Sequence, residues 1–154
     1  MQESNVTGYS TGTEAVVSTL NKFLRGELSA VETYNQAMER LASSPFASDL
    51  ALCKRSHQER VELLRQQIVR LGGKPSEGSG AWGSFAKLVE GGAKVFGEKA
   101  AVAALEEGED HGLKLYRSDL DKLDVVTRDV VVRSLQPEQE RTHETMSRIK
   151  KSVH

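Results

Sequence analysis

The chain has 154 residues, of which 38% are hydrophobic, enough for one domain with a real core. Its 21 basic and 22 acidic residues give a net charge of -1, so no overall field favours nucleic acid or an anionic membrane. Aromatic residues make up only 5% of the chain and basic residues are scattered, which argues against a surface that stacks bases. We therefore expect no nucleic-acid partner.

Cysteine usage and hydropathy indicate the compartment. Cys53 is the single cysteine, which excludes an intrachain disulfide and fits a reducing cytoplasm. The N-terminus lacks the basic and apolar regions of a signal peptide. No apolar run approaches the roughly 18 residues needed to span a bilayer. These features predict a cytoplasmic protein that has no membrane partner.

Apolar periodicity predicts two helices in the first half of the chain. Residues 1–12 are polar and rich in Ser, Thr and Gly, which is typical of a flexible tail, and Thr13 can cap the first helix. Ser44 and Pro45 fit the N-cap and first position of a second helix, which Gly72-Gly73 ends. The positions of the first helix that face the core, which we call its seam, are spaced alternately by three and four residues. They are Leu20, Leu24, Glu27, Val31, Tyr34, Met38 and Leu41.

A breaker-rich connection, about 72–97, separates this hairpin from a second one. Its apolar part, 84–96, is expected to form a short helix across one end of the molecule. A third helix begins near Glu98, and a fourth runs from about Asp124 to Ser152 with a kink or local break at Pro137. The pattern predicts an all-α, antiparallel four-helix bundle over residues 13–152, with one long crossover between the second and third helices.

One pattern of residues occurs twice in the sequence, 82 residues apart. The matching positions are Gly26 and Gly108, Glu27 and Glu109, Tyr34 and Tyr116, and Leu41 and Leu123. Both glutamates stand where the helical period demands an apolar residue. Burying an unpaired carboxylate costs several kcal/mol, so each glutamate needs a neutralising group.

Histidines on the other two helices are candidates for that group. His57 lies on the seam of the second helix, and Glu140 and His143 are three residues apart on one face of the fourth. His57 and His143 are separated by 86 residues, one helical turn more than the repeat. We therefore expect all five side chains to point into one volume. Buried carboxylates with imidazoles are typical ligands of iron, manganese or zinc.

The segment LNKFLRGELSAVETY at residues 20–34 resembles the first helix of bacterioferritins. The remainder, through LRQQIVRLGGKP, EGEDHGLKLY and ERTHETM, resembles a bacterial ferritin-like family of unknown function, over roughly residues 14–150. The resemblance implies a ferritin-like bundle in which Glu27 and Glu109 are terminal carboxylate ligands, Glu140 bridges, His57 and His143 are terminal nitrogen ligands, and Tyr34 and Tyr116 lie beside the ligands.

The chain departs from the ferritin-like pattern on the second helix, where Lys54 stands in place of the glutamate of Glu-x-x-His. If Lys54 points inward, the cluster charge falls to about -2 and matches a single divalent metal. If Lys54 instead reaches solvent, Glu106 is placed to supply the missing carboxylate. An alternative alignment, anchored on the LGGKP ending, shifts the second helix by three residues and puts His57 at the glutamate position and Arg60 at the histidine position.

Three functions fit these features. The first is a metal-binding protein holding one or two irons, or manganese or zinc, that oxidises Fe(II) or consumes peroxide. The second is a metal-free interaction or stress protein, in which Lys54 pairs with Glu27 or Glu140. The third, a 24-subunit storage cage, is disfavoured because no fifth helix is visible; a monomer or homodimer is expected.

Overall fold

The structure is a computed structural model that describes residues 11–80 and 97–153, and within these ranges all regular secondary structure is helical. The long helices are α1 (Thr11–Arg40), α2 (Ala47–Arg70), α4 (Glu98–Ser118) and α6 (Gln136–Ser152). Two short helices, η2 (Leu120–Lys122) and α5 (Val125–Val130), and a π-helical turn, η3 (Val131–Leu135), connect α4 to α6. The predicted all-α bundle is confirmed. The short helix predicted at 84–96 lies outside the described residues.

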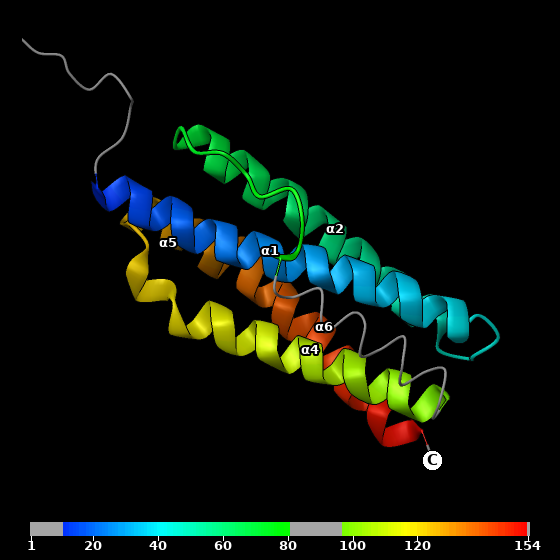
Figure 1. Ribbon diagram of the computed structural model, residues 1–154. Coiled ribbons are helices and arrows are strands. Elements are labelled where there is room, and N and C mark those ends of the chain that lie inside the picture. The colour runs from blue at the N-terminus through cyan, green and yellow to red at the C-terminus, as the bar shows by residue number, and fades with distance from the viewer. Residues whose placement is uncertain (1–10, 81–96, 154) are drawn as a thin grey trace, which may run out of the picture.

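The four long helices lie side by side as two hairpins (Figure 1). α1 packs against α2 and α4, and α6 packs against α4 and α2. α4 starts at the end of the bundle where α2 also starts, opposite the end where α2 finishes (Figure 1). As a result α2 and α4 run parallel while each hairpin is antiparallel, which is the arrangement of a bundle with one crossover.

Two helix starts differ from the prediction. α1 already includes Thr11 and Gly12, so Thr13 lies inside the helix and is not its cap. α2 begins at Ala47, two residues after Pro45, and Phe46 donates its backbone N–H to the Ser44 hydroxyl at 3.0 Å. The starts of α1 and α2 differ from the prediction by three and two residues, close to the one or two residues by which definitions of a helix end usually differ.

The segment before α6 widens by one π-helical turn. Gln136 donates its backbone N–H to the carbonyl of Val131, five residues back. Pro137 follows and has no N–H to give, so the regular ladder is altered here, as the sequence predicts. The turn lets Val131, Leu135 and Gln139 all be buried although they are spaced by fours rather than by 3.6 residues.

The core consists of two apolar clusters with a polar layer between them. One cluster surrounds Phe23 and Leu135, and the other surrounds Leu50 and Met146. These four side chains are fully buried. The polar layer lies midway along the four helices and contains the repeated glutamates.

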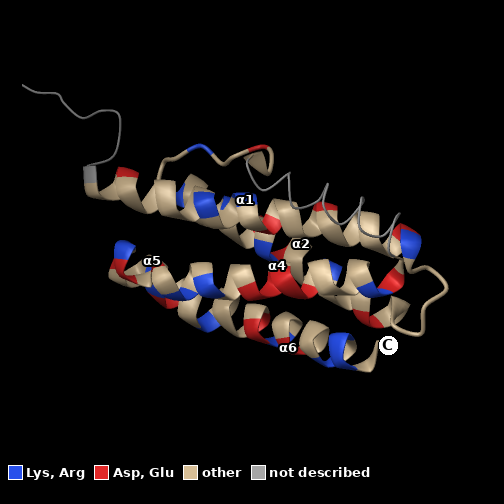
Figure 2. Ribbon diagram, turned by 60° about the horizontal axis from the view of Figure 1, so that its bottom comes forward, with Lys and Arg blue, Asp and Glu red and all other residues tan. Residues whose placement is uncertain are grey.

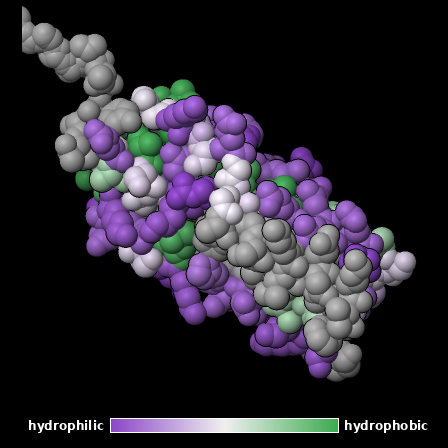
Figure 3. Space-filling model, viewed as in Figure 1, coloured by the Kyte–Doolittle hydropathy of each residue, from purple (hydrophilic) through white to green (hydrophobic). Residues whose placement is uncertain are grey.

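The outside of the molecule is mostly polar, with both signs of charge on every long helix (Figures 2 and 3). Large exposed apolar side chains in the described part of the chain are few, the most exposed being Val125, Val69 and Val126. Within the same ranges, no helix is both long and apolar enough to cross a membrane.

Candidate functional site

Glu27 on α1 and Glu109 on α4 are buried at the centre of the bundle, with 4% and 2% of their surfaces exposed. Each stands at the core step that the periodicity predicts. Desolvation of this degree favours the protonated acid unless nearby groups compensate. The surrounding side chains supply that compensation from all four long helices.

His57 on α2 bridges the two glutamates. Its Nδ1 lies 2.5 Å from an oxygen of Glu27, and its Nε2 lies 2.7 Å from an oxygen of Glu109. Both ring nitrogens can donate only when the imidazole is doubly protonated. Burial and the Arg60 charge lower the pKa of His57, but the two carboxylates outweigh them and raise it above its usual value. Both contacts and the raised pKa therefore favour the imidazolium form of His57.

Arg60, one turn further along α2, supplies the second positive charge. It is 2% exposed, and its guanidinium donates to Glu27 at 3.3 Å, to Thr142 at 3.0 Å and to the side-chain oxygen of Gln139. A guanidinium is not a metal ligand and keeps its charge at every physiological pH. With His57 and Arg60 positive and the two glutamates negative, the cluster is neutral overall.

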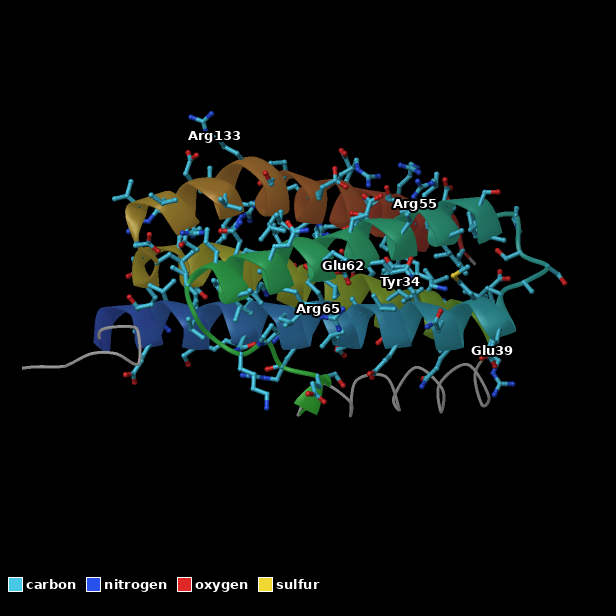
Figure 4. The ribbon with its side chains drawn as sticks, turned by 90° about the horizontal axis from the view of Figure 1, so that it is seen from above. Tyr34, Glu39, Arg55, Glu62, Arg65 and Arg133 are labelled. Carbon is cyan, nitrogen blue, oxygen red and sulfur yellow. The ribbon has the colours of Figure 1, made fainter. Side chains whose placement is uncertain are left out.

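The two repeated tyrosines cross between the halves of the molecule. Tyr34 of α1 donates to Glu109 at 2.5 Å, and Tyr116 of α4 donates to Glu27 at 2.5 Å. Each tyrosine is seven residues after the glutamate of its own helix, about 10.5 Å along the axis, and so meets the glutamate of the antiparallel neighbour. Figure 4 shows Tyr34 among the helices rather than on the outside.

Two uncharged residues of α6 complete the layer. Gln139 donates to the backbone carbonyl of Glu109 at 2.8 Å and to its carboxylate at 2.9 Å. Thr142 donates to the same carboxylate at 2.7 Å. Gly112 allows the close approach, because a Cβ there would lie 2.9 Å from the Gln139 amide nitrogen. Glu109 thus accepts four bonds through its side chain, which fills the acceptor positions of a carboxylate.

These contacts explain the acidity of the cluster. Burial raises the pKa of Glu109, but the charge and hydrogen bond of His57, the Arg60 charge and the Tyr34 hydroxyl together lower it to about 2. Burial likewise opposes ionisation of Glu27, and Arg60 and His57 bring its pKa below the usual value. Burial and the neighbouring carboxylates raise the pKa values of Tyr34 and Tyr116 well above 10. Both tyrosines therefore keep their protons.

The structure brings together three of the five predicted ligands, Glu27, His57 and Glu109, and excludes the other two. Glu140 lies outside the layer with 48% of its side chain exposed, 3.4 Å from Arg117. His143 is partly exposed, 3.6 Å from Asp110 and 3.9 Å from Glu106. Convergence of all five side chains was therefore a wrong prediction. Each excluded residue comes one position after a core residue of α6, which turns it by about 100° away from the core.

The remaining candidates also lie outside the layer. Lys54 is partly exposed and makes none of the cluster's hydrogen bonds or ion pairs. Glu106 accepts from Ser147 at 3.3 Å and from Lys150 at 3.4 Å instead of joining Glu109. Of the two alternatives for Lys54, the structure therefore has the outward one, and Glu106 does not add a carboxylate to the layer.

The residues of α2 that enter the polar layer are His57 and Arg60, and not Lys54. His57 and Gln139 are 82 residues apart, as are Arg60 and Thr142, the same interval as the repeated glutamates. Each pair sits at equivalent core positions of α2 and α6. Extending the 82-residue repeat strictly would have found Gln139 and Thr142; matching histidine to histidine missed them.

A hollow lies beside the polar layer between α1 and α4. It is lined by Gly26, Ala30 and Gly108, by apolar side chains, and by Glu27 and Tyr116 among the polar ones. Its empty volume is about 480 Å³ when the solvent at its open side is counted. Inside, the centre of a water molecule has only about 30 Å³ in which to move, so the hollow is narrow.

The polar layer does not have the donor set of a di-metal centre. Such a centre uses four carboxylates and two neutral imidazoles, whereas this layer has two carboxylates, one imidazolium and a guanidinium. In residues 11–80 and 97–153, no group of three or more His, Cys, Asp or Glu side chains is arranged to hold a metal ion. The oxygens of Glu109 already have their full set of donors.

Comparison with known families assigns the chain to one of them. A family described as a domain of unknown function (DUF2383) matches residues 15–122, more than two thirds of the chain. The chain belongs to the DUF2383 family. The DUF2383 match contains both glutamates, both tyrosines, His57 and Arg60, and it ends before α6, which carries Gln139 and Thr142. No curated protein and no solved structure matched the chain.

Proposed function

We propose that this DUF2383 protein is a metal-independent helical bundle of the ferritin-like type, in which a buried ion cluster stands where a di-metal centre would be. It acts as an interaction or stress protein, by binding rather than by oxidising Fe(II) or consuming peroxide. The observation that carries the proposal is the Arg60 guanidinium, which is 2% exposed and bonded to Glu27, Gln139 and Thr142.

The positions of the polar residues support a relationship to the ferritin-like pattern. That pattern has one glutamate on each of two helices and Glu-x-x-His on each of the other two. Here α1 and α4 keep their glutamates, α2 has His57-x-x-Arg60, and α6 has Gln139-x-x-Thr142. The same six positions are polar and buried, but four of them carry side chains that pair with the glutamates.

Charge balance supports the absence of a metal requirement. A divalent metal would add two positive charges to a layer that is already neutral, and desolvated excess charge is strongly unfavourable. Neutrality would return only if His57 lost its proton and the Arg60 charge were also removed, and a guanidinium keeps its charge at every physiological pH.

A single-metal site is the second candidate. The observation that favours it is the close grouping of Glu27, His57 and Glu109. The two ring nitrogens of His57 lie 2.5 Å from a Glu27 oxygen and 2.7 Å from a Glu109 oxygen. Iron, manganese and zinc all accept this ligand chemistry. Binding would require His57 to lose a proton, so this candidate predicts proton release with metal uptake.

One experiment separates the two candidates. The full chain, purified without chelators, is analysed for metals, and its thermal midpoint is measured with EDTA and then with Fe(II), Mn(II) or Zn(II). We expect substoichiometric metal and a midpoint that neither EDTA nor added metal changes. One or two tightly bound metals per chain, or a metal-dependent rise that Glu27→Gln abolishes, would overturn the proposal. Glu140→Gln, on the exposed face of α6, is the matched control.

We further propose that the protein is a monomer or a homodimer and not a 24-subunit cage. The support is the surface of the described residues, which exposes few large apolar side chains. Sedimentation of the full chain tests this directly, since a cage would sediment far ahead of a 16.9 kDa chain or its dimer.

A further inference from the structure

The hairpin α1–α2 and the hairpin α4–α6 are related by an approximate two-fold axis. Tyr34 donates to Glu109, and Tyr116 donates to Glu27. The 82-residue repeat converts one of these contacts into the other. Reciprocal contacts of this kind are typical of two-fold interfaces between identical subunits. The inner faces of the two hairpins therefore meet as the two halves of a dimer do.

The axis passes between α2 and α6, where two residues touch their own equivalents. Ser56 and Glu138 are 82 residues apart and are hydrogen-bonded at 2.8 Å. Arg60 and Thr142 are also 82 residues apart, and their side chains are hydrogen-bonded at 3.0 Å. A residue can touch its own equivalent only beside the axis. The side chain at position 60 therefore meets the side chain at position 142 directly.

Arg60 and Thr142 fit together on the axis because only one of them is charged. Their exposed fractions are 2% and 0%, so the contact is shielded from solvent. The Thr142 hydroxyl accepts from Arg60 and donates to Glu109 at 2.7 Å. An arginine at both positions would bring two guanidinium groups together away from water, and buried like charges are strongly unfavourable.

The same geometry disfavours the pairing of two identical hairpins from different copies of the chain. Two α1–α2 hairpins would place Arg60 against the Arg60 of the second copy. Two α4–α6 hairpins would bury two Glu109 carboxylates beside the uncharged Gln139 and Thr142. Only the pairing of α1–α2 with α4–α6 avoids both arrangements.

We propose that Arg60 determines which partner the inner face of α1–α2 accepts. That face fits a helical hairpin with a small, uncharged residue at the position equivalent to Arg60, which α4–α6 supplies as Thr142. It excludes the α1–α2 hairpin of a second copy. The inference goes beyond the proposed function, because a metal-independent layer does not require one particular pairing.

The test moves the cations from α2 to α6 in the full chain, in two halves. The first half-exchange, His57→Gln with Arg60→Thr, leaves both hairpins without a cation in the layer. The second, Gln139→His with Thr142→Arg, places arginine on both sides of the axis, as the pairing of two α1–α2 hairpins would. We expect each to lower the urea midpoint of unfolding, and the chain with all four substitutions to have a higher midpoint than either, because it again has one arginine on the axis.

Losses that add in the four-substitution chain, or its failure to fold, would overturn the proposal. A folded four-substitution chain beside half-exchanges that do not fold would support it as well as a difference in midpoint. Thr145→Arg, one turn from the axis residue on the partly exposed side of α6, is the matched control for Thr142→Arg and should leave the midpoint nearly unchanged.

A glycine sharpens the test. Gly112 makes room for Gln139, since a Cβ there would lie 2.9 Å from the amide nitrogen, and Ala30 is its equivalent on α1. A glutamine at position 57 therefore needs glycine at position 30. Ala30→Gly should raise the midpoint of the four-substitution chain and lower that of the wild type, where it only weakens the helix. A lower midpoint in both chains would contradict the equivalence of the two inner faces.

Discussion

The two hairpins of this bundle repeat each other in position but not in charge. Both supply a buried glutamate and a tyrosine that reaches across to the glutamate of the other half. The second helix of each hairpin has two buried polar residues at positions that correspond in the 82-residue repeat. On α2 these are His57 and Arg60, and on α6 they are Gln139 and Thr142. One half therefore provides both neutralising cations and the other only neutral donors. The difference teaches that a duplicated acid pair can be stabilised asymmetrically without a metal.

The most severe disruption of this asymmetry is Arg60→Met. Within the described residues, Arg60 and His57 are the charge partners of Glu27, so this change leaves a buried carboxylate partly uncompensated. We expect a loss of about 3 kcal/mol in the free energy of unfolding, measured with urea. Arg65→Met, on the same helix but partly exposed and paired with Glu62, should cost below about 0.5 kcal/mol. Equal effects of the two variants would contradict the assigned role of Arg60.

Pairing between Arg60 and Glu27 can be isolated by a double-mutant cycle. Glu27→Gln should destabilise the wild type more than it destabilises the Arg60→Met protein, because in the latter the carboxylate has already lost a partner. A coupling free energy of about 1–3 kcal/mol is expected from residues in one network. Additive losses would mean that the two side chains do not act together.

The imidazolium makes the first hairpin sensitive to alkaline pH. Since the two carboxylates raise the pKa of His57, its contribution is fully present below the unfolded value of about 6.5 and is lost as pH rises through the higher folded value. The wild type should therefore exceed His57→Gln in stability by about 2 kcal/mol near pH 6, and less at pH 10. Urea unfolding at both pH values checks this; a difference that does not change with pH would contradict it.

At acid pH the glutamates control stability instead. The pKa of Glu109 is held at about 2, so its contribution is present above the unfolded value of about 4.5 and is lost as pH falls toward 2. Glu109→Gln should remove part of the stability loss between these pH values.

The crossed tyrosines test the equality of the two halves. Tyr34→Phe and Tyr116→Phe each delete one hydrogen bond to a buried carboxylate, at 2.5 Å in both cases. Each should cost about 1.5 kcal/mol in urea unfolding, with losses similar to one another. If only one variant loses stability, the crossed arrangement is not symmetric in energy.

The smallest effects belong to the residues that the layer excludes. Glu140→Gln and His143→Gln alter partly exposed ion pairs on α6 and should each change the free energy of unfolding by less than about 0.5 kcal/mol. A loss of more than about 2 kcal/mol in thermal or urea unfolding would place these side chains in the core.

Much of this arrangement can be predicted from the sequence, because apolar periodicity determines which helix faces are buried. It predicted four helices, the crossover, and burial of Glu27, His57 and Glu109. The position of Arg60 was open between alignments, because an arginine on a seam can be a surface residue or a buried counterion. Gln139 and Thr142 were missed because Glu140 and His143 matched a familiar spacing, and a polar seam gives no hydrophobic signal to choose between adjacent residues.

The most direct measurement is the protonation of His57 in the folded chain, by NMR of its ring nitrogens at pH 7 and during titration to alkaline pH. If Glu27 and Glu109 are neutralised by His57 and Arg60, both ring nitrogens carry a proton at pH 7, and the pKa of His57 lies above about 6.5. A neutral ring with one bare nitrogen at pH 7 would contradict a cluster balanced by its own cations.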